Sequence, residues 1–215
     1  MKNNNFVLVD NYLSDVENYK KRHEISELWL TDELKNIKDK AVKLDKQDDA
    51  KKAWCYKTIH KIQQIYLKAF FAMKEERFYD GWCLLEQVEI SIHSLEKHFP
   101  FSSDDDYKIH FIDKQVTQFQ TLYPYTLFIS PAFLHLDKEC SICGAKISIR
   151  NFCGHKKGEI YNGEMCVHKI NNIEPLEVSI VSNPVQKYSV LFLSDSETGE
   201  QIDQYDYELL THVTQ

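Results

Sequence analysis

Apolar side chains recur every three or four residues between Leu13 and about Phe99, which is the spacing of amphipathic helices. Ser14 and Glu17 have the spacing of a capping box, so we expect a first helix to begin there. A second apolar run begins near Asp32. The third run is the strongest, and its members are Trp54, Ile59, Ile62, Ile65, Tyr66, Ala69, Phe70 and Met73.

A fourth run passes through Leu85, Val88 and Ile92 and ends before Pro100. Glycine and proline disfavour helix interiors most strongly, and neither occurs before Gly81. The pattern therefore predicts three or four long helices that pack as an antiparallel bundle.

A polar, acidic segment ends this pattern at residues 101–106. We place a domain boundary there, with a helical bundle domain at residues 1–103 and a β-rich domain at residues 104–215. Apolar residues alternate from Tyr107 to Phe111 as in a strand, and a short helix is expected within residues 114–122.

Two later segments carry strand signals. Residues 176–181 alternate between apolar and polar, and a turn at Asn183-Pro184 suggests residues 188–193 as their partner strand. A short helix is expected at residues 205–213. The predicted fold class is therefore α+β, with a helical bundle followed by a small β-rich domain.

Composition narrows the class of protein. Of the 215 residues 43% are hydrophobic and 13% aromatic, as in a folded domain, and the net charge of -7 argues against a protein that mainly coats nucleic acid. No apolar run approaches the roughly 18 residues of a membrane span, and the N-terminal run is too short for a signal peptide. We therefore expect a cytoplasmic protein without membrane contact, in which clustered cysteines hold metal rather than form disulfides.

Reactive side chains concentrate between Cys140 and His168. Four of the six cysteines and four of the six glycines lie in this stretch. Cys140 and Cys143 are two residues apart and precede Gly144, the spacing of a zinc knuckle, whose glycine allows backbone N–H groups to point at the sulfurs. Cys166 completes a set of thiols, so we predict a Zn²⁺ site in a loop at about residues 138–170.

The remaining ligand position is open between two neighbours. Cys153 and His155 are one residue apart, and crowding usually lets only one of such a pair bind; we favour His155 slightly. His168 is the weakest candidate. Because thiolates dominate and enough ligands exist to close a tetrahedron, we expect a structural rather than a catalytic zinc, which would supply folding energy to a loop poor in apolar residues.

Two other groups of residues have simpler interpretations. Cys55 and Cys83 lie in helical patterns and are expected to be buried small hydrophobes. A polar helix face carries Glu86, Glu89, His93 and Glu96. We interpret it as solvated or salt-bridged, because a di-iron site would need Glu-x₂-His on two separate helices.

The spacing Cys140-x₂-Cys-Gly, Cys153-x-His-x₂-Gly-x₂-Tyr-x-Gly-x₂-Cys166, followed by Glu177-Val-Ser-Ile-Val-Ser-Asn-Pro184, resembles a small zinc-binding module. Such modules occur in uncharacterised bacterial proteins and in some tailed-phage structural proteins. The resemblance covers about a quarter of the chain. It implies zinc held by the matching cysteine and histidine positions and an origin in bacteria or a mobile element, and it implies no reaction.

Three functions follow as hypotheses. The first is a non-enzymatic interaction or accessory protein of a bacterial or phage-related assembly, with antiviral defence as one setting and a protein as its partner. The second is a metal-supported nuclease that uses His168 with Asn171 or Asn172. The third is a zinc-knuckle nucleic-acid-binding protein. Its candidate contacts are Lys146, Arg150, Lys156, Lys157 and Lys169.

Overall fold

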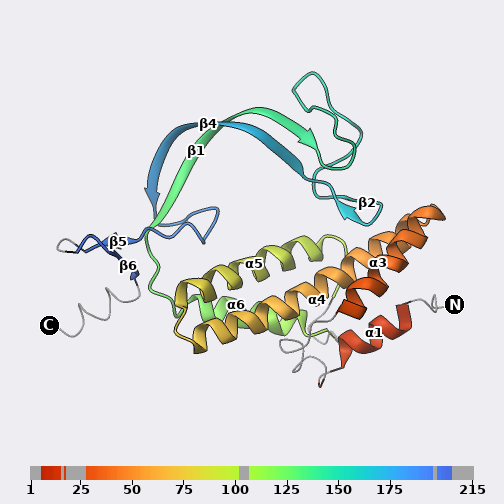
Figure 1. Cartoon of the computed structure of the whole chain (residues 1–215), viewed down its shortest axis with the longest axis horizontal. Helices are drawn as coiled ribbons and strands as arrows, with labels where there is room; N and C mark the ends of the chain where they lie inside the picture. The colour runs from red at the N-terminus through yellow and green to blue at the C-terminus, as the bar shows by residue number, and fades with distance from the viewer. Residues whose placement is uncertain (1–5, 16, 18–27, 102–106, 196–197, 205–215) are drawn as a thin grey trace.

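The computed structural model describes residues 6–15, 17, 28–101, 107–195 and 198–204, and within them it has the predicted α+β architecture (Figure 1). The helices are α1 (Val7–Ser14), α3 (Leu28–Lys43), α4 (Gln47–Lys74), α5 (Phe78–Glu96) and α6 (Ile109–Gln120). The strands are β1 (Phe128–Cys140), β2 (Ile160–Tyr161), β3 (Glu164–Met165), β4 (His168–Val181), β5 (Leu193–Ser194) and β6 (Gln201–Ile202). We call the five helices the helical body, β1 and β4 the ribbon, and residues 140–168 the Cys/His module.

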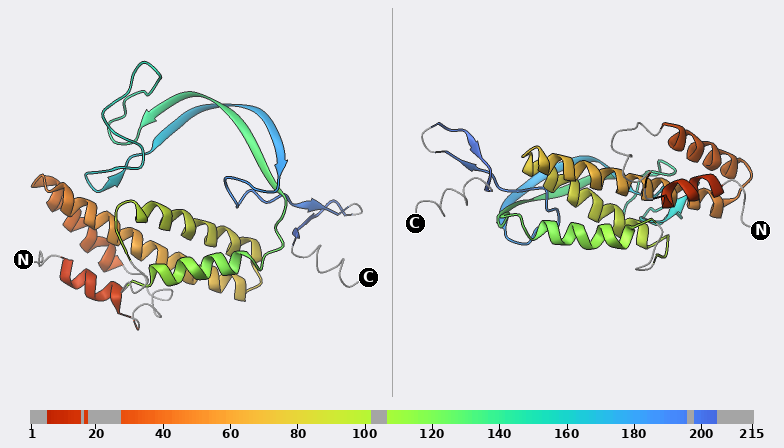
Figure 2. Two further views of the ribbon diagram at one scale, coloured as in Figure 1. Left: turned by 180° about the vertical axis from the view of Figure 1, so that it is seen from behind. Right: turned by 90° about the horizontal axis from the view of Figure 1, so that it is seen from below.

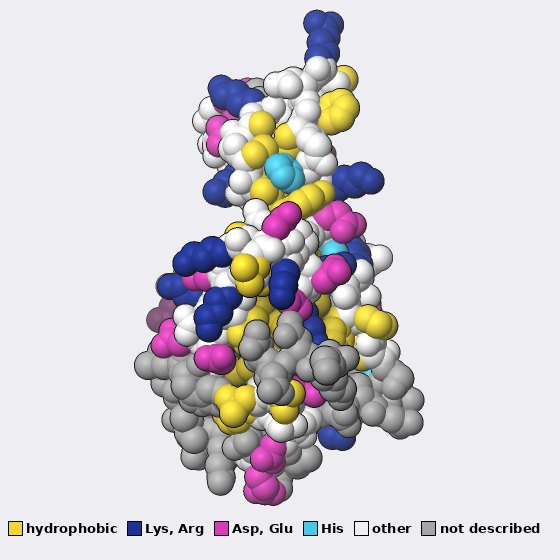
Figure 3. Space-filling model, turned by 90° about the vertical axis from the view of Figure 1, so that its right-hand side faces the viewer, with side chains coloured by type: hydrophobic (Ala, Val, Ile, Leu, Met, Phe, Trp, Pro, Cys, Tyr) yellow, Lys and Arg dark blue, Asp and Glu magenta, His cyan; other side chains and the backbone are white. Residues whose placement is uncertain are grey.

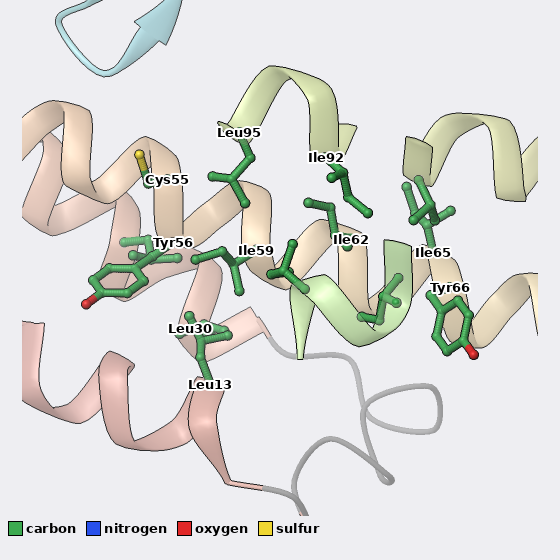
Figure 4. Close-up of a cluster of buried hydrophobic side chains, with 14 of the residues drawn as sticks. Leu13, Leu30, Cys55, Tyr56, Ile59, Ile62, Ile65, Tyr66, Ile92 and Leu95 are labelled. Atoms are coloured by element: carbon green, nitrogen blue, oxygen red, sulfur yellow. The ribbon is translucent and has the colours of Figure 1, made fainter. Parts of the chain in front are cut away.

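The core of the helical body is built around α4, which contacts α1, α3, α5 and α6. The predicted third apolar run is its buried face, in which Ile59, Ile62 and Ala69 are all 0% exposed. Figure 4 shows side chains of the neighbouring helices around Ile59 and Ile62. The prediction is confirmed for most of the run, whereas Phe70 is 47% exposed and lies at its edge. Helices α3 and α5 likewise match the second and fourth runs.

The structure corrects the first predicted helix start. Ser14 is the last residue of α1, and its hydroxyl donates to the carbonyl oxygen of Asp10 at 3.0 Å, so the capping-box prediction is wrong. Val9 and Leu13 are buried, which explains why a helix precedes the serine. The helix predicted to follow Ser14 falls largely on residues outside the described ones.

The predicted strand after the acidic segment is also wrong. Helix α6 begins at Ile109, because Ile109, Ile112 and Val116 bury one helical face in the core of the body, and Phe111 stays 50% exposed. The predicted boundary between residues 103 and 104 lies outside the described residues, as does the helix expected at residues 205–213, and the division into domains stays a prediction.

The ribbon is an antiparallel pair that arches over the helical body (Figures 1 and 2). Its register pairs Phe128 with Val181 at one end and Cys140 with His168 at the other. The prediction that residues 188–193 pair with residues 176–181 is therefore wrong. Register shifts follow Ala132 and His135, and such bulges bend and twist a strand pair, which accounts for the arch.

The first foot of the arch rests on the N-terminal part of α5. Trp82, Tyr125, Phe128 and Val190 form a small second core, and the Trp82 indole N–H donates to the Lys187 carbonyl oxygen at 2.5 Å. The buried Gln204 amide donates to the carbonyl oxygens of Leu127 and Leu191. Within the described residues, no helix is long and apolar enough to cross a membrane.

Candidate metal centre

The Cys/His module opens at the point where β1 ends. Cys140 is the last residue of β1, and the Gly144 N–H donates to the Cys140 carbonyl oxygen at 2.9 Å, which closes a tight turn. Gly144 has φ +70, and a Cβ added at this position would have no neighbour within 4 Å, so glycine is needed there for its backbone conformation rather than for space. The turn is the predicted knuckle.

Four of the predicted donors converge on one point. The ligand atoms of Cys140, Cys143, Cys153 and His155 all lie within 4.8 Å of one another. The fifth predicted donor is close as well, since Cys166 Sγ lies 3.8 Å from Cys140 Sγ. Cys140 and Cys166 are buried, and Cys143 is exposed. The five predicted ligands are thus brought together, and which four of them bind a metal stays a prediction.

His155 presents a nitrogen suited to a metal. Its Nδ1 is buried and has no hydrogen-bond partner among the described residues, and its ring packs edge-on against Tyr161 with centroids 4.6 Å apart. The backbone N–H of Lys156 donates to the Tyr161 hydroxyl at 3.0 Å, which fixes that tyrosine. A buried polar atom without a partner is costly, and a metal ion would satisfy it.

The thiols of the cluster shift one another's pKa values through electrostatic interactions and hydrogen bonds. Burial opposes ionisation of Cys140, yet hydrogen bonds from the backbone N–H groups of Cys143 and Ile142 and from neighbouring thiols lower its pKa to about 6. Burial and the adjacent Cys140 raise the pKa of Cys166 to about 11. The pKa of Cys153 is also raised: the backbone N–H of His155 favours its thiolate, but burial and the neighbouring thiols outweigh that bond. One thiolate therefore discourages the next, and a dication placed among them would remove this repulsion.

The module also rests on the helical body, which forms the second foot of the arch. Asn162 and Gly163 make the tight turn between β2 and β3, and there Gln47 Nε2 donates to Asn162 Oδ1 at 2.8 Å. The Asn162 N–H donates to Gln47 Oε1 at 3.0 Å, so both polar atoms of the Gln47 side-chain amide bind Asn162. Lys38 Nζ lies 2.5 Å from Glu164 Oε1.

The segment that follows α5 also contacts this foot. The His98 ring donates from Nε2 to the Gly158 carbonyl oxygen at 2.7 Å. Lys38, Gln47 and His98 were not predicted to act at the module. The dipeptide Asn162-Gly163 is typical of a hairpin turn, but it does not indicate which part of the chain that turn contacts.

Residues proposed for a nuclease lie on the ribbon. His168 begins β4 opposite Cys140 and is not one of the four convergent donors. Asn172 donates to Asp137 Oδ2 at 2.8 Å across the ribbon, and Asn171 is exposed. The described part of the chain holds no second group of three or more His, Cys, Asp or Glu side chains suited to a metal.

The two remaining cysteines lie in the helical body, away from the metal ligands. Cys55 is buried, as predicted, and burial raises its pKa to about 11. Cys83 is only partly buried. The expected solvated face of α5 is wrong for Glu86, which is 3% exposed, and right for Glu89, whose carboxylate pairs with Lys187 at 2.5 Å.

Comparison with known proteins adds no relative: no family model, no curated protein and no solved structure matches the chain.

Proposed function

We propose that this chain is a non-enzymatic, zinc-binding interaction protein, in which Zn²⁺ holds the Cys/His module in shape. The observation that carries the proposal is the convergence of three thiols and one imidazole within 4.8 Å at the end of the ribbon. Soft thiolates with imidazole are the ligands typical of structural zinc. Cys140 and Cys143 would hold the ion with two of Cys153, His155 and Cys166.

The proposed role of the ion is to supply the folding energy that this region lacks. The module has short strands of two residues each, and exposed side chains such as Ile149 and Phe152, so packing alone offers it little. Metal ligation can substitute for a hydrophobic core in segments of this size. The ion would then fix the module as a rigid surface where it rests on the helical body.

The setting we propose is a cytoplasmic accessory subunit of a bacterial or phage-related assembly, with a protein partner and with antiviral defence as one context. The resemblance of the module to zinc modules of bacterial and tailed-phage proteins supports this setting. The helical body offers a second surface to such an assembly.

Elemental analysis of the purified protein tests the metal. We expect about one zinc per chain, lost in Cys140→Ser and retained in the control Cys83→Ser, whose thiol lies outside the cluster. Cobalt substitution in His155→Ala and Cys166→Ser, read by the thiolate-to-cobalt absorption bands, identifies the remaining ligands. Protein purified under reducing conditions without stoichiometric metal would contradict the proposal.

The same pair of variants tests the interaction role. Affinity purification from the native host, with quantitative mass spectrometry, should recover a partner with the parent and with Cys83→Ser, and lose it with Cys140→Ser. Equal recovery with both variants would show that the metal module takes no part in the contact.

A further inference from the structure

Charge is distributed unevenly along this acidic chain. Residues 138–169 carry six Lys or Arg and three Asp or Glu, a net +3 in a chain of net -7, which leaves -10 on the remaining residues. Three thiolates around Zn²⁺ contribute -1, so the loaded segment stays at about +2. The acidic Glu164 is already paired with Lys38 of the helical body. That pairing leaves a larger excess of positive charge on the rest of the segment.

Two adjoining grooves lie at this segment, and they meet at Ile147, which lines both. The first has a volume of about 490 Å³ and is lined by His135, Lys138, Ile147, Ser148, Ile149 and Arg150. The second has a volume of about 380 Å³, and Phe152, Lys156, Lys157 and His168 are among its lining residues. Four cations and three histidines line the two grooves, and no Asp or Glu does. We call this pair of grooves the basic track.

Apolar side chains lie exposed beside these cations. Phe152 is 78% exposed and Ile149 is fully exposed, on a polar loop where packing does not require them. In the side view of Figure 3, dark blue Lys and Arg side chains gather on the upper lobe around exposed hydrophobic ones. Among the described residues, Arg150, Lys156 and Lys157 form no ion pair. Exposed aromatic and cationic groups on one groove are a typical contact surface.

We propose that the basic track binds single-stranded nucleic acid. Lysine and arginine would contact successive phosphates, and the Phe152 ring would stack on an unpaired base, the combination that single strands require. Three of the four cations, Arg150, Lys156 and Lys157, lie on irregular loops of the module and not on a helix that could enter the major groove of a duplex. This inference deepens the proposed function and rests on it, because the metal shapes the track.

Fluorescence anisotropy with the zinc-loaded protein and a labelled single-stranded RNA of mixed sequence tests the inference; single-stranded DNA and the RNA duplex serve as competitors. We expect saturable binding to a single strand. With four phosphate contacts, raising the salt from about 50 to about 200 mM should weaken binding about 50-fold. Arg150→Glu/Lys157→Glu should lose at least about tenfold in affinity and show a shallower salt dependence.

The matched control is Lys61→Glu/Lys68→Glu, which makes the same charge change on exposed positions of α4. It should change the affinity less than about twofold, whereas Phe152→Ala should weaken binding about tenfold. Zinc content is measured on every sample, so a failure of the inference is distinct from a failure of the metal proposal.

Three results would overturn the inference while zinc remains stoichiometric. They are no binding to either single strand, equal losses in the two double variants, and preference for the duplex. A fourth is self-association, seen by sedimentation, that Arg150→Glu/Lys157→Glu abolishes; this would show that the acidic surface of a second copy occupies the track instead.

Discussion

The helical body and the arch above it are stabilised in different ways. Side chains such as Ile62, Leu85 and Leu95 are 0% exposed in the helical body. In the ribbon, apolar side chains of β4 remain largely in solvent: Leu176 is 63% and Val178 is 68% exposed. The helical body is therefore stabilised by burial of apolar area. The two strands of the ribbon bury too little apolar area to be stabilised in the same way.

The arch depends on its two ends instead. At the first foot, Trp82 and the Gln204 amide hold the ribbon against the helical body. At the second foot, the predicted metal ligands and the turn at Asn162 hold the module. The difference teaches that a segment such as the arch can keep a fixed shape outside the hydrophobic core when polar contacts and a metal take the place of apolar packing. It also implies that the two regions respond to different perturbations.

Removal of zinc should have the largest effect, and it should destabilise the Cys/His module while the helical body stays folded. Zinc contributes of the order of 10 kcal/mol of apparent folding free energy in small zinc-dependent units. We expect chelation to speed amide hydrogen exchange by orders of magnitude at residues 140–168, and to leave exchange at the centre of α4 unchanged. Slowly exchanging module amides in metal-free protein would show that packing holds the module after all.

A cavity in the helical body should have the opposite effect, because it should destabilise the body and leave the zinc site intact. Ile62→Ala removes a fully buried side chain and should lower the free energy of unfolding by about 2–5 kcal/mol, measured by urea denaturation. Zinc content should not change. Ile90→Ala, at a position that is 48% exposed, is the control and should cost less than about 1 kcal/mol. Loss of zinc from the Ile62 variant would mean that the two regions are coupled more tightly than their contacts indicate.

A substitution at Gly163 tests the contact between the β2–β3 turn and the helical body. Its φ is +70, and a Cβ would lie 3.0 Å from the Ala50 carbonyl oxygen and 2.7 Å from Lys38 side-chain carbons. Gly163→Ala should therefore cost about 1–2 kcal/mol and increase amide exchange at residues 160–165 without loss of zinc. Gly199→Ala shares a positive φ but has nothing within 4 Å of the Cβ, and it separates backbone strain from the clash. Equal effects of the two substitutions would mean that the tip does not depend on close approach to α4.

The helices were predictable where one face is buried. The 3.6-residue period finds α3, α4 and α5 because each buries a continuous stripe. It fails at α6, where Tyr107 to Phe111 mimic a strand; the deciding fact is the tertiary burial of Ile109 and Ile112, which local alternation does not contain.

The candidate site was predictable for a different reason. Ligand spacing follows from covalent reach and metal geometry, so Cys140 and Cys143 could be paired without knowledge of the fold. The ribbon could not be predicted in this way, because Phe128 and Val181 pair although the whole module lies between them in the sequence. Local turn signals favoured the nearer partner strand. Lys38, Gln47 and His98 were missed since contacts between distant segments leave no local pattern.

The smallest effect is expected at Glu86, where the C-terminal half contacts a polar group of the body. The carboxyl is 3% exposed and accepts the Lys187 N–H at 3.1 Å, while its other oxygen is buried without a partner among the described residues. Burial raises its pKa above the ordinary 4.5, against the hydrogen bond and charge of Lys187. Glu89 and His93 face the same group and act in opposite directions.

The sign of the pH dependence follows from that shift. A carboxyl whose pKa is raised on folding favours the folded state at low pH, and its contribution is lost as pH rises from the ordinary value through the raised one. Glu86→Gln cannot ionise, so its stability relative to the parent should improve as the pH rises from about 4 to about 7.5. Urea denaturation at both pH values measures this, with the exposed Glu96→Gln on the same helix as control. A relative stability that stays constant with pH would show that the Lys187 contact fully compensates the buried charge, and that polar contacts between the two regions cost the body nothing.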